Sequence, residues 1–195
     1  MIKTRSDLKY YLAEDLKRIG WSMPWWKAFT FSETYRIHSY IRNLRYLEYY
    51  TNNRKWYNLP IYAYHMLQHR RMSLRNVMNI SPNVMGPGFK FVHPGFLRIN
   101  PGAHIGKNCT ILPNVLIGRK MPGIKRTADG GMEDVDRGLD PFYIGDNCYI
   151  GTGAILLIPK SIGDNVTIAA GSIVLDDIPD NCVVAGAPAK IVKRL

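Results

Sequence analysis

Apolar positions in the first part of the chain recur every three or four residues, which is the period of amphipathic helices. A first helix is predicted to end at Gly20, with Ser6 as its N-cap. A second helix is predicted over about 32–50, and a third from after Pro60 toward residues 69–71. The apolar positions that define these helices are Leu8, Tyr11, Leu12, Leu16 and Ile19, then Tyr35, Ile37, Ile41, Leu44 and Leu47, then Ile61, Tyr64, Met66 and Leu67.

From about residue 80 onward the period changes to six. In most repeats an aliphatic residue is followed directly by Gly or Ala, and a small or β-branched residue tends to lie four positions after it. The aliphatic series is Ile99, Ile105, Ile111, Ile117, Ile144, Ile150, Leu156, Ile162, Ile168 and Val174. The series four positions later is Ala103, Cys109, Val115, Cys148, Ala154, Val166 and Ser172.

A period of six matches neither a helix nor simple strand alternation. It predicts a solenoid in which each hexapeptide forms one short strand and a turn, and three hexapeptides form one triangular coil. Coils then stack about 4.8 Å apart, with the aliphatic residues piled up inside. Ordinary β-hairpins would need turn signals about every 8 to 12 residues and would not hold one register across an interruption. The predicted fold is therefore mainly β.

The register breaks once, between Ile117 and Ile144. The interruption, at about 119–142, is a polar, Gly-rich insertion that should project from one corner of the solenoid. Loops of this length in a compact domain are usually functional or disordered.

Charge and composition divide the 195-residue chain near Asn76. Residues 1–76 hold 14 Lys+Arg and 5 Asp+Glu, a net of +9, together with all four Trp; residues 77–195 hold 12 and 10, a net of +2. We therefore predict a basic, aromatic helical segment at 1–76 and the solenoid domain at 77–195. The longest charge-free runs are too short to span a bilayer, the start lacks a secretory signal, and three cysteines cannot all pair within one chain, so a cytoplasmic location is expected.

Two stretches carry a family resemblance: the run from Gly86 to Asn108 (Gly-Pro-Gly-Phe-Lys-Phe-Val-His-Pro-Gly…) and the ending Val184-Ala-Gly-Ala-Pro-Ala-Lys-Ile-Val. Together with the repeat, they resemble the hexapeptide-repeat acyltransferases, in particular the branch with serine O-acetyltransferase and the acetyltransferases of capsule and exopolysaccharide synthesis. The resemblance covers residues 77–195 well and the helical segment loosely. It implies a left-handed parallel β-helix that forms a homotrimer, or a dimer of trimers, with active sites between adjacent prisms. It also implies acetyl-CoA as cosubstrate and no metal.

His93 matches the position of the catalytic His of that family. A hydroxyl needs a base to lose its proton as it attacks a thioester, and a neutral imidazole suits this role at neutral pH. The family's acidic partner for this His is replaced by Asn79, whose amide oxygen can orient an imidazole more weakly than an ion does. The resemblance further implies coenzyme A contacts at Gly153, Ala154, Ala170, Gly171, Ala187 and Pro188, with Lys190 pairing a phosphate.

The acceptor is predicted from what the chain lacks. Val92 stands where the family's serine-binding carboxylate would be, and Leu139-Asp140 stands where an Arg-His pair would be. Both anchors for an amino acid zwitterion therefore look lost, which favours a sugar hydroxyl over serine as the acceptor. Two alternatives stay open: serine acetylation, and a trimeric scaffold without catalysis.

Other polar residues favour structural roles. His104 is expected at the surface, and His38, His65 and His69 have no metal-ligand partner at diagnostic spacing. Cys109 and Cys148 fall in inward positions, which argues against an acyl-cysteine intermediate and for direct transfer.

The basic front segment has three interpretations. It is a solvated cap that completes the trimer, a surface for anionic phospholipid as Trp25-Trp26-Lys27 and the Arg-rich helices suggest, or a surface that steers an acidic polysaccharide. Nucleic acid is not expected as a partner, since no recognisable reader module accompanies the charge.

Overall fold

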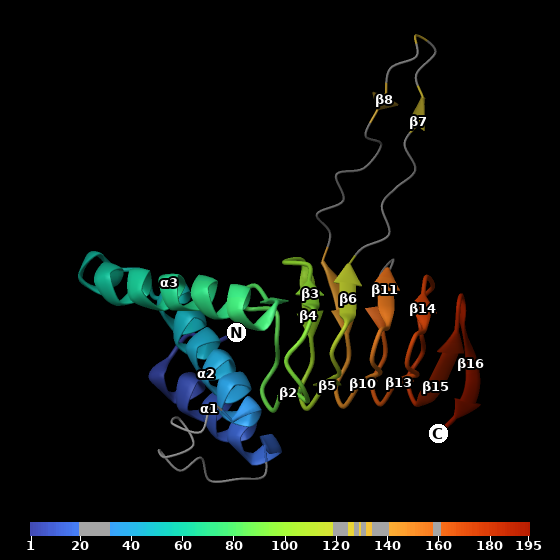
Figure 1. The fold of residues 1–195 in the computed structure, drawn as a ribbon, viewed down its shortest axis with the longest axis horizontal. Helices are drawn as coiled ribbons and strands as arrows, with labels where there is room; N and C mark the ends of the chain where they lie inside the picture. Colours follow the sequence, from blue (N-terminus) through green and yellow to red (C-terminus); the bar gives the residue numbers. More distant parts are fainter. Residues whose placement is uncertain (20–31, 119–124, 127–128, 130–131, 134–140, 158–160) are drawn as a thin grey trace.

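Three parallel β-sheets form the three sides of a prism in the computed structural model of this chain (Figure 1). The structure describes residues 1–19, 32–118, 125–126, 129, 132–133, 141–157 and 161–195. The first sheet contains β1 (Met78–Asn79), β3 (Leu97–Ile99), β6 (Val115–Gly118), β11 (Ile155–Leu157) and β14 (Ile173–Val174). The second contains β2 (Lys90–Phe91), β5 (Thr110–Ile111), β10 (Tyr149–Ile150), β13 (Thr167–Ile168), β15 (Cys182–Gly186) and β16 (Ala189–Arg194). The third contains β4 (Ala103–Ile105), β9 (Phe142–Ile144) and β12 (Ser161–Ile162).

The chain visits the three sheets in turn, so sequence neighbours lie on different sides and hydrogen-bonded neighbours lie one coil apart. Among the described strands of the prism, β16 alone departs from this pattern: it folds back antiparallel on β15 and closes the far end. This architecture is a three-sided parallel β-helix. The prediction of a mainly β solenoid with six-residue repeats is confirmed.

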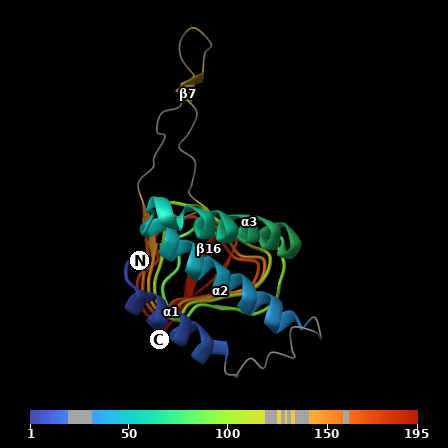
Figure 2. The ribbon, with the colours of Figure 1, turned by 90° about the vertical axis from the view of Figure 1, so that its left-hand side faces the viewer.

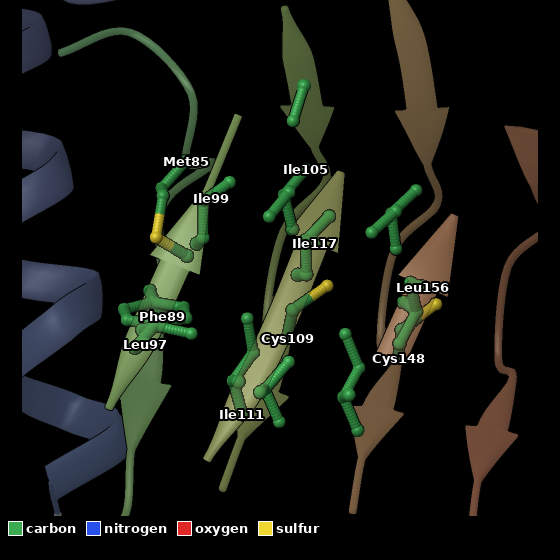
Figure 3. Close-up of a cluster of buried hydrophobic side chains, with 14 of the residues drawn as sticks. Met85, Phe89, Leu97, Ile99, Ile105, Cys109, Ile111, Ile117, Cys148 and Leu156 are labelled. Atoms are coloured by element: carbon green, nitrogen blue, oxygen red, sulfur yellow. The ribbon is translucent and has the colours of Figure 1, made fainter. Parts of the chain in front are cut away.

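The aliphatic repeat positions fill the interior of the prism. All residues of the series from Ile99 to Val174 are at most 4% exposed, and those four positions later are at most 1% exposed. Figure 3 shows Ile105, Ile117, Cys109 and Leu156 within the cluster of buried side chains in the interior of the prism. Each coil buries its aliphatic side chains against those of its neighbours, so the stack is stabilised coil by coil.

One corner of the prism is built from Asn residues in a left-handed backbone conformation. Asn147, Asn165 and Asn181 have φ between 56° and 58°. Their side-chain amides form a ladder: Asn147 Nδ2 donates to Asn165 Oδ1 at 3.1 Å, and Asn165 Nδ2 donates to Asn181 Oδ1 at 2.8 Å. Asn adopts this conformation more readily than other non-Gly residues, and its side chain hydrogen-bonds locally.

The residue before each of these turns must be small. A Cβ on Gly163 would lie only 2.6 Å from the backbone nitrogen of Asp180 in the next coil. Asp180 accepts a hydrogen bond from the Asp164 backbone nitrogen at 2.8 Å at the same place. At this corner, the glycine that follows the aliphatic position is therefore required by the close approach of the coils.

The insertion contributes one described pairing, the antiparallel strands β7 (Lys125–Arg126) and β8 (Met132–Glu133). Apart from residue 129, the rest of 119–140 lies outside the described residues.

Three helices cover the end of the prism that carries β1 and β2, as Figures 1 and 2 show. They are α1 (Arg5–Ile19), α2 (Glu33–Asn52) and α3 (Leu59–Asn76), with a short 3-10 helix, η2 (Trp56–Asn58), before α3. Helix α2 packs between α1 and α3. The prediction of three helices in this segment is confirmed, with α3 longer than expected.

One detail of the helix prediction is wrong. Helix α1 begins one residue earlier than Ser6, and its N-cap is Thr4. The Thr4 hydroxyl accepts a hydrogen bond from the Asp7 backbone nitrogen at 3.0 Å, and the Asp7 carboxylate accepts one from the Thr4 backbone nitrogen. This reciprocal pair outcompetes a lone Ser6 cap. In α3, Tyr64 and Leu67 follow the helical spacing and are exposed. Gly20 lies outside the described residues.

A buried arginine joins the helices to the first coil. Arg45 of α2 is fully buried; its Nε donates to Asp15 of α1 at 2.8 Å and its Nη1 donates to Glu48 at 3.0 Å. The same guanidinium donates to the backbone oxygens of Met85 at 2.8 Å and Gly86 at 2.6 Å. One side chain therefore contacts α1, α2 and the start of the β-helix.

The two carboxylates complete the connection. Asp15 Oδ1 accepts a hydrogen bond from the Phe89 backbone nitrogen at 3.0 Å, and Glu48 Oε1 accepts one from the Asn83 backbone nitrogen at 2.9 Å. Burial raises the pKa of Glu48, and the charge of Arg45 offsets part of that rise. Every polar atom of this cluster named here has a partner, which is the condition for a buried ionic network to hold a unique geometry.

Replacing Arg45 with Met should destabilise the protein by about 3–5 kcal/mol, because it leaves two buried carboxylates without a counter-charge. Chemical denaturation followed by circular dichroism, at equal protein concentration, measures the loss. The matched control is Lys17→Met, which removes the exposed ion pair with Glu14 and should leave the unfolding midpoint unchanged. An Arg45→Met protein as stable as the parent would contradict this role of the network.

Candidate active site

His93 lies at the corner that follows β2, with its imidazole 61% exposed. Its Nδ1 is 2.9 Å from Oε1 of Glu33. An ionised carboxylate only accepts hydrogen bonds, so Nδ1 carries a proton, and in the neutral ring the lone pair is on Nε2. The geometry thus leaves one ring nitrogen able to take a proton from a group in solution.

Glu33 is the partner of His93 that the sequence pattern missed. It lies in the first turn of α2, where an acidic side chain interacts favourably with the helix dipole. It precedes His93 by 60 residues and comes from the helical segment, so no local spacing joins the two. The expected partner, Asn79, does not contact Nδ1 within the chain; Glu33 does.

The register of the second sheet places His93 in a column with turns from later coils. Phe91, Ile111, Ile150, Ile168 and Val184 occupy equivalent positions in successive strands. Two residues after each of these lie His93, Pro113, Thr152, Ala170 and Gly186. Backbone hydrogen bonds connect the turns: the Gly153 nitrogen donates to Pro113 at 3.2 Å, and the Gly171 nitrogen donates to Thr152 at 2.8 Å.

Five of the seven residues expected to contact coenzyme A therefore lie on one edge of the prism. Gly153, Ala170, Gly171, Ala187 and Pro188 all belong to these turns. From the Ala170 turn to the His93 turn is three coil spacings, or about 14 Å. We call this row of turns the His93 edge.

The turns of the His93 edge differ in what their backbones offer. Gly153 and Gly171 have φ of +73° and +68°, a conformation that favours glycine, and both donate their N–H groups to neighbouring turns. Ala154 is fully buried and donates its N–H to the Gly151 oxygen, so its side chain belongs to the core. Ala170 is exposed, and the backbone hydrogen bonds recorded for the described chain include none donated by its N–H. A ligand along this edge would find a donor there.

Lys190 lies on β16, at the closed end of the prism. Its Nζ is 3.8 Å from Asp176 Oδ2, and both side chains are mostly exposed. Exposed ion pairs of this kind are weak, so the ammonium group can exchange Asp176 for a phosphate.

Asn79 lies on a different side of the prism from the strand that leads to His93. It belongs to β1, and it lines a small groove of about 190 Å³ with Ser81 and Arg98. It also lines a groove of about 840 Å³ between α3 and the first coil, which includes His69. The chain does not bring Asn79 and His93 together.

The other histidines have structural contacts. His65 stacks on Tyr46 with ring centroids 5.2 Å apart, and its Nδ1 is 2.8 Å from Asn43 Oδ1. His104 stacks on Tyr143. Among the described residues, no three His, Cys, Asp or Glu side chains form a group that could hold a metal ion.

The cysteines are free and buried. The neighbouring Cys148 thiol, together with burial, holds the pKa of the Cys109 thiol above its usual range. A thiol in this state is a poor nucleophile. In the part of the chain that the structure describes, no helix is both long and apolar enough to cross a bilayer.

The fold and the repeat define a left-handed β-helix of hexapeptide repeats, and the resemblance to the acyltransferases of this class is confirmed. The family described as "Hexapeptide repeat of succinyl-transferase" matches residues 141–176. The Saccharomyces cerevisiae protein YJL218W, named as an inferred acetyltransferase, is 42% identical over 96 residues, which are 46% of this chain and 47% of that protein. The chain thus spans about half the length of this curated relative.

Two solved structures extend the comparison to almost the whole chain. Serine acetyltransferase from Brucella abortus in complex with coenzyme A matches 97% of this chain and 69% of its own, with 22% identity and a TM-score of 0.69. Serine acetyltransferase from Neisseria gonorrhoeae in complex with serine matches 97% and 70%, with 26% identity and a TM-score of 0.63. The helical segment therefore belongs to the shared fold as well as the β-helix.

His69 gives the helix–prism junction a pH dependence. Its Nε2–H donates to the Ile80 oxygen at 3.0 Å, its ring stacks on Tyr40, and burial lowers its pKa. The folded protein keeps this ring neutral, whereas the unfolded chain protonates it near pH 6.5. Between the lowered pKa and about pH 6.5 the unfolded state binds more protons, so stability falls as the pH falls through that window.

We therefore expect the free energy of unfolding to decrease between pH 7.5 and pH 5, and His69→Gln, which keeps an N–H donor, to make this decrease smaller. Urea titrations at a series of pH values measure the slope. The matched control His104→Gln should leave it unchanged. An equal slope in parent and His69→Gln proteins would show that His69 does not contribute.

Proposed function

We propose that this protein is an acetyl-CoA-dependent O-acetyltransferase that uses His93 as general base. The observation that carries the proposal is the position of the exposed His93 imidazole. Glu33 contacts one of its ring nitrogens, and His93 lies in the first of the aligned turns that form the His93 edge, where the coenzyme A contacts are expected. The likeness to hexapeptide-repeat acetyltransferases, among them complexes with coenzyme A, supports it.

The chemistry asked of His93 is proton removal. An alcohol is a weak nucleophile at neutral pH, so Nε2 of His93 takes the hydroxyl proton as the oxygen attacks the thioester carbonyl carbon. The C–S bond of the thioester would then break as the new ester forms, and the proton on Nε2 would pass to the leaving thiolate. Acetyl-CoA supplies the activated acyl group when bound. Glu33 keeps Nδ1 protonated and stabilises the imidazolium that forms. Because Cys109 and Cys148 are buried inside the prism, transfer is direct rather than through an acyl-cysteine.

The His93 edge is the proposed binding surface for the cosubstrate. The Ala170 N–H offers a donor to the pantetheine amides, and the exposed turn of Ala187 and Pro188 lies toward the adenine end. Lys190 would pair a phosphate in place of Asp176. The proposed assembly is a cytoplasmic homotrimer with each active site between neighbouring prisms.

A sugar hydroxyl is the proposed acceptor, which fits a role in capsule or exopolysaccharide synthesis. Val92, directly before His93, carries no charge for an amino group, and Asn79 replaces an acidic residue of the serine enzymes. Leu139-Asp140 lies outside the described residues. Serine is the second candidate, supported by the likeness to a serine acetyltransferase bound to serine. A non-catalytic trimeric scaffold is the third.

Replacing His93 with Ala should lower acetyl-CoA turnover about 100-fold or more, the scale of general-base catalysis.

Glu33→Gln should lower kcat about tenfold, as expected for loss of a group that orients a histidine, with an unchanged KM for acetyl-CoA. Glu33→Asp should recover part of the loss. Thiol release measures turnover, and calorimetry with coenzyme A checks that His93→Ala still binds the cosubstrate.

These variants separate the alternatives. A parent protein with no affinity for coenzyme A would support the scaffold and reject the enzyme. Full turnover in His93→Ala would reject His93 as the base while leaving an acetyltransferase in place.

A panel of acceptors tests the substrate class. We expect thiol release with simple sugars or glycan fragments to exceed that with serine at equal concentration, because the chain lacks the charged anchors for a zwitterion. Efficient turnover of serine would overturn the preference for a sugar.

A further inference from the structure

Helix α3 presents an apolar stripe to solvent. Tyr64 is 56% exposed, Leu67 is 61% exposed and Leu74 is 84% exposed. These positions are three and seven residues apart, so they lie on one face of the helix. The preceding turn η2 adds Trp56, which is 82% exposed, and Tyr57. We call these five residues the α3 stripe.

The position of α3 explains why the stripe is uncovered. Helix α3 packs on α2 along one flank and contacts the prism at β1, so it forms the edge of the helical layer. Figures 1 and 2 show it lying across the end of the prism opposite β16. Large apolar side chains gathered on an exposed helix face mark an interaction surface.

The charges around the stripe all have one sign. Five exposed basic residues flank it: Arg54, Lys55, Arg70, Arg71 and Arg75. The chain contains no Asp or Glu from residue 49 through residue 128. Of the ion pairs formed between described residues, none includes any of these five side chains.

The positive charge around the α3 stripe favours one kind of binding partner over two others. A second copy of the same face would bring like charges together, which costs several kcal/mol at an interface. A soluble acidic polysaccharide would satisfy the arginines and leave Trp56 and Leu74 in water. An anionic bilayer uses both features: its headgroups attract the basic residues, and its interfacial region takes up Trp, Tyr and Leu side chains.

We propose that the α3 stripe and its basic rim bind the surface of an anionic bilayer, with α3 lying in the plane of the interface. The protein then docks by its helical end, and the closed end of the prism at β16 points away from the bilayer. This surface is distinct from the His93 edge, so its test does not depend on the acetyltransferase activity.

Vesicle flotation at about 0.15 M salt tests the proposal. The parent protein should float with vesicles of phosphatidylcholine and phosphatidylglycerol and not with phosphatidylcholine alone. Each basic residue near the surface contributes about fivefold in affinity, so R71E/R75E should weaken binding at least about 25-fold. W56S/L74S should weaken it with the net charge unchanged.

The matched control is K193E/R194E, which makes the same change in net charge at the opposite end of the prism and should float like the parent. Circular dichroism and light scattering verify that the variants stay folded, with the oligomeric state of the parent. Thiol release with a soluble acceptor should be unchanged in the stripe variants.

Three results would overturn the proposal. The parent protein could fail to float with anionic vesicles. K193E/R194E could lose binding as strongly as R71E/R75E, which would indicate a non-specific charge effect. W56S/L74S could change the oligomeric state, which would assign the stripe to a contact between subunits.

Discussion

Stacking of hexapeptides in strict register is the constraint on which the rest of this structure depends. Each coil places its aliphatic residues over those of the coil below, and a slip of one residue would turn every inward side chain outward. The same register also determines which turns are aligned on the outer surface of the prism. Because Phe91 is aligned with Ile111, Ile150 and Ile168, the turns that follow these strands form one straight edge that begins at His93.

The helical segment turns this edge into a candidate active site. Arg45, Asp15 and Glu48 bind α1 and α2 to the first coil through charges and backbone groups that are all buried. With α2 held in this way, Glu33 at its start reaches the His93 ring at the corner of the prism. The helices are therefore part of the chemistry that we propose, and the β-helix alone would lack the carboxylate.

Sequence patterns were sufficient for the parts of the molecule that repeat. The six-residue series predicted which residues are buried from Ile99 to Val174, because burial there follows from the register alone. Sequence patterns failed where contacts between distant parts of the chain determine a residue's partner or its exposure. Glu33 meets His93 across 60 residues. Tyr64 and Leu67 keep a helical period, but α3 packs on one flank only and leaves them in solvent. Thr4 displaced Ser6 as a cap through a reciprocal bond with Asp7.

The most direct test of the account is a crystal structure of the protein with bound coenzyme A. We expect the cosubstrate to lie along the turns at Ala187, Ala170 and Gly153, with its sulfur beside Nε2 of His93 and with Glu33 still bonded to Nδ1. Coenzyme A bound on another side of the prism, or an imidazole turned away from its sulfur, would contradict the account.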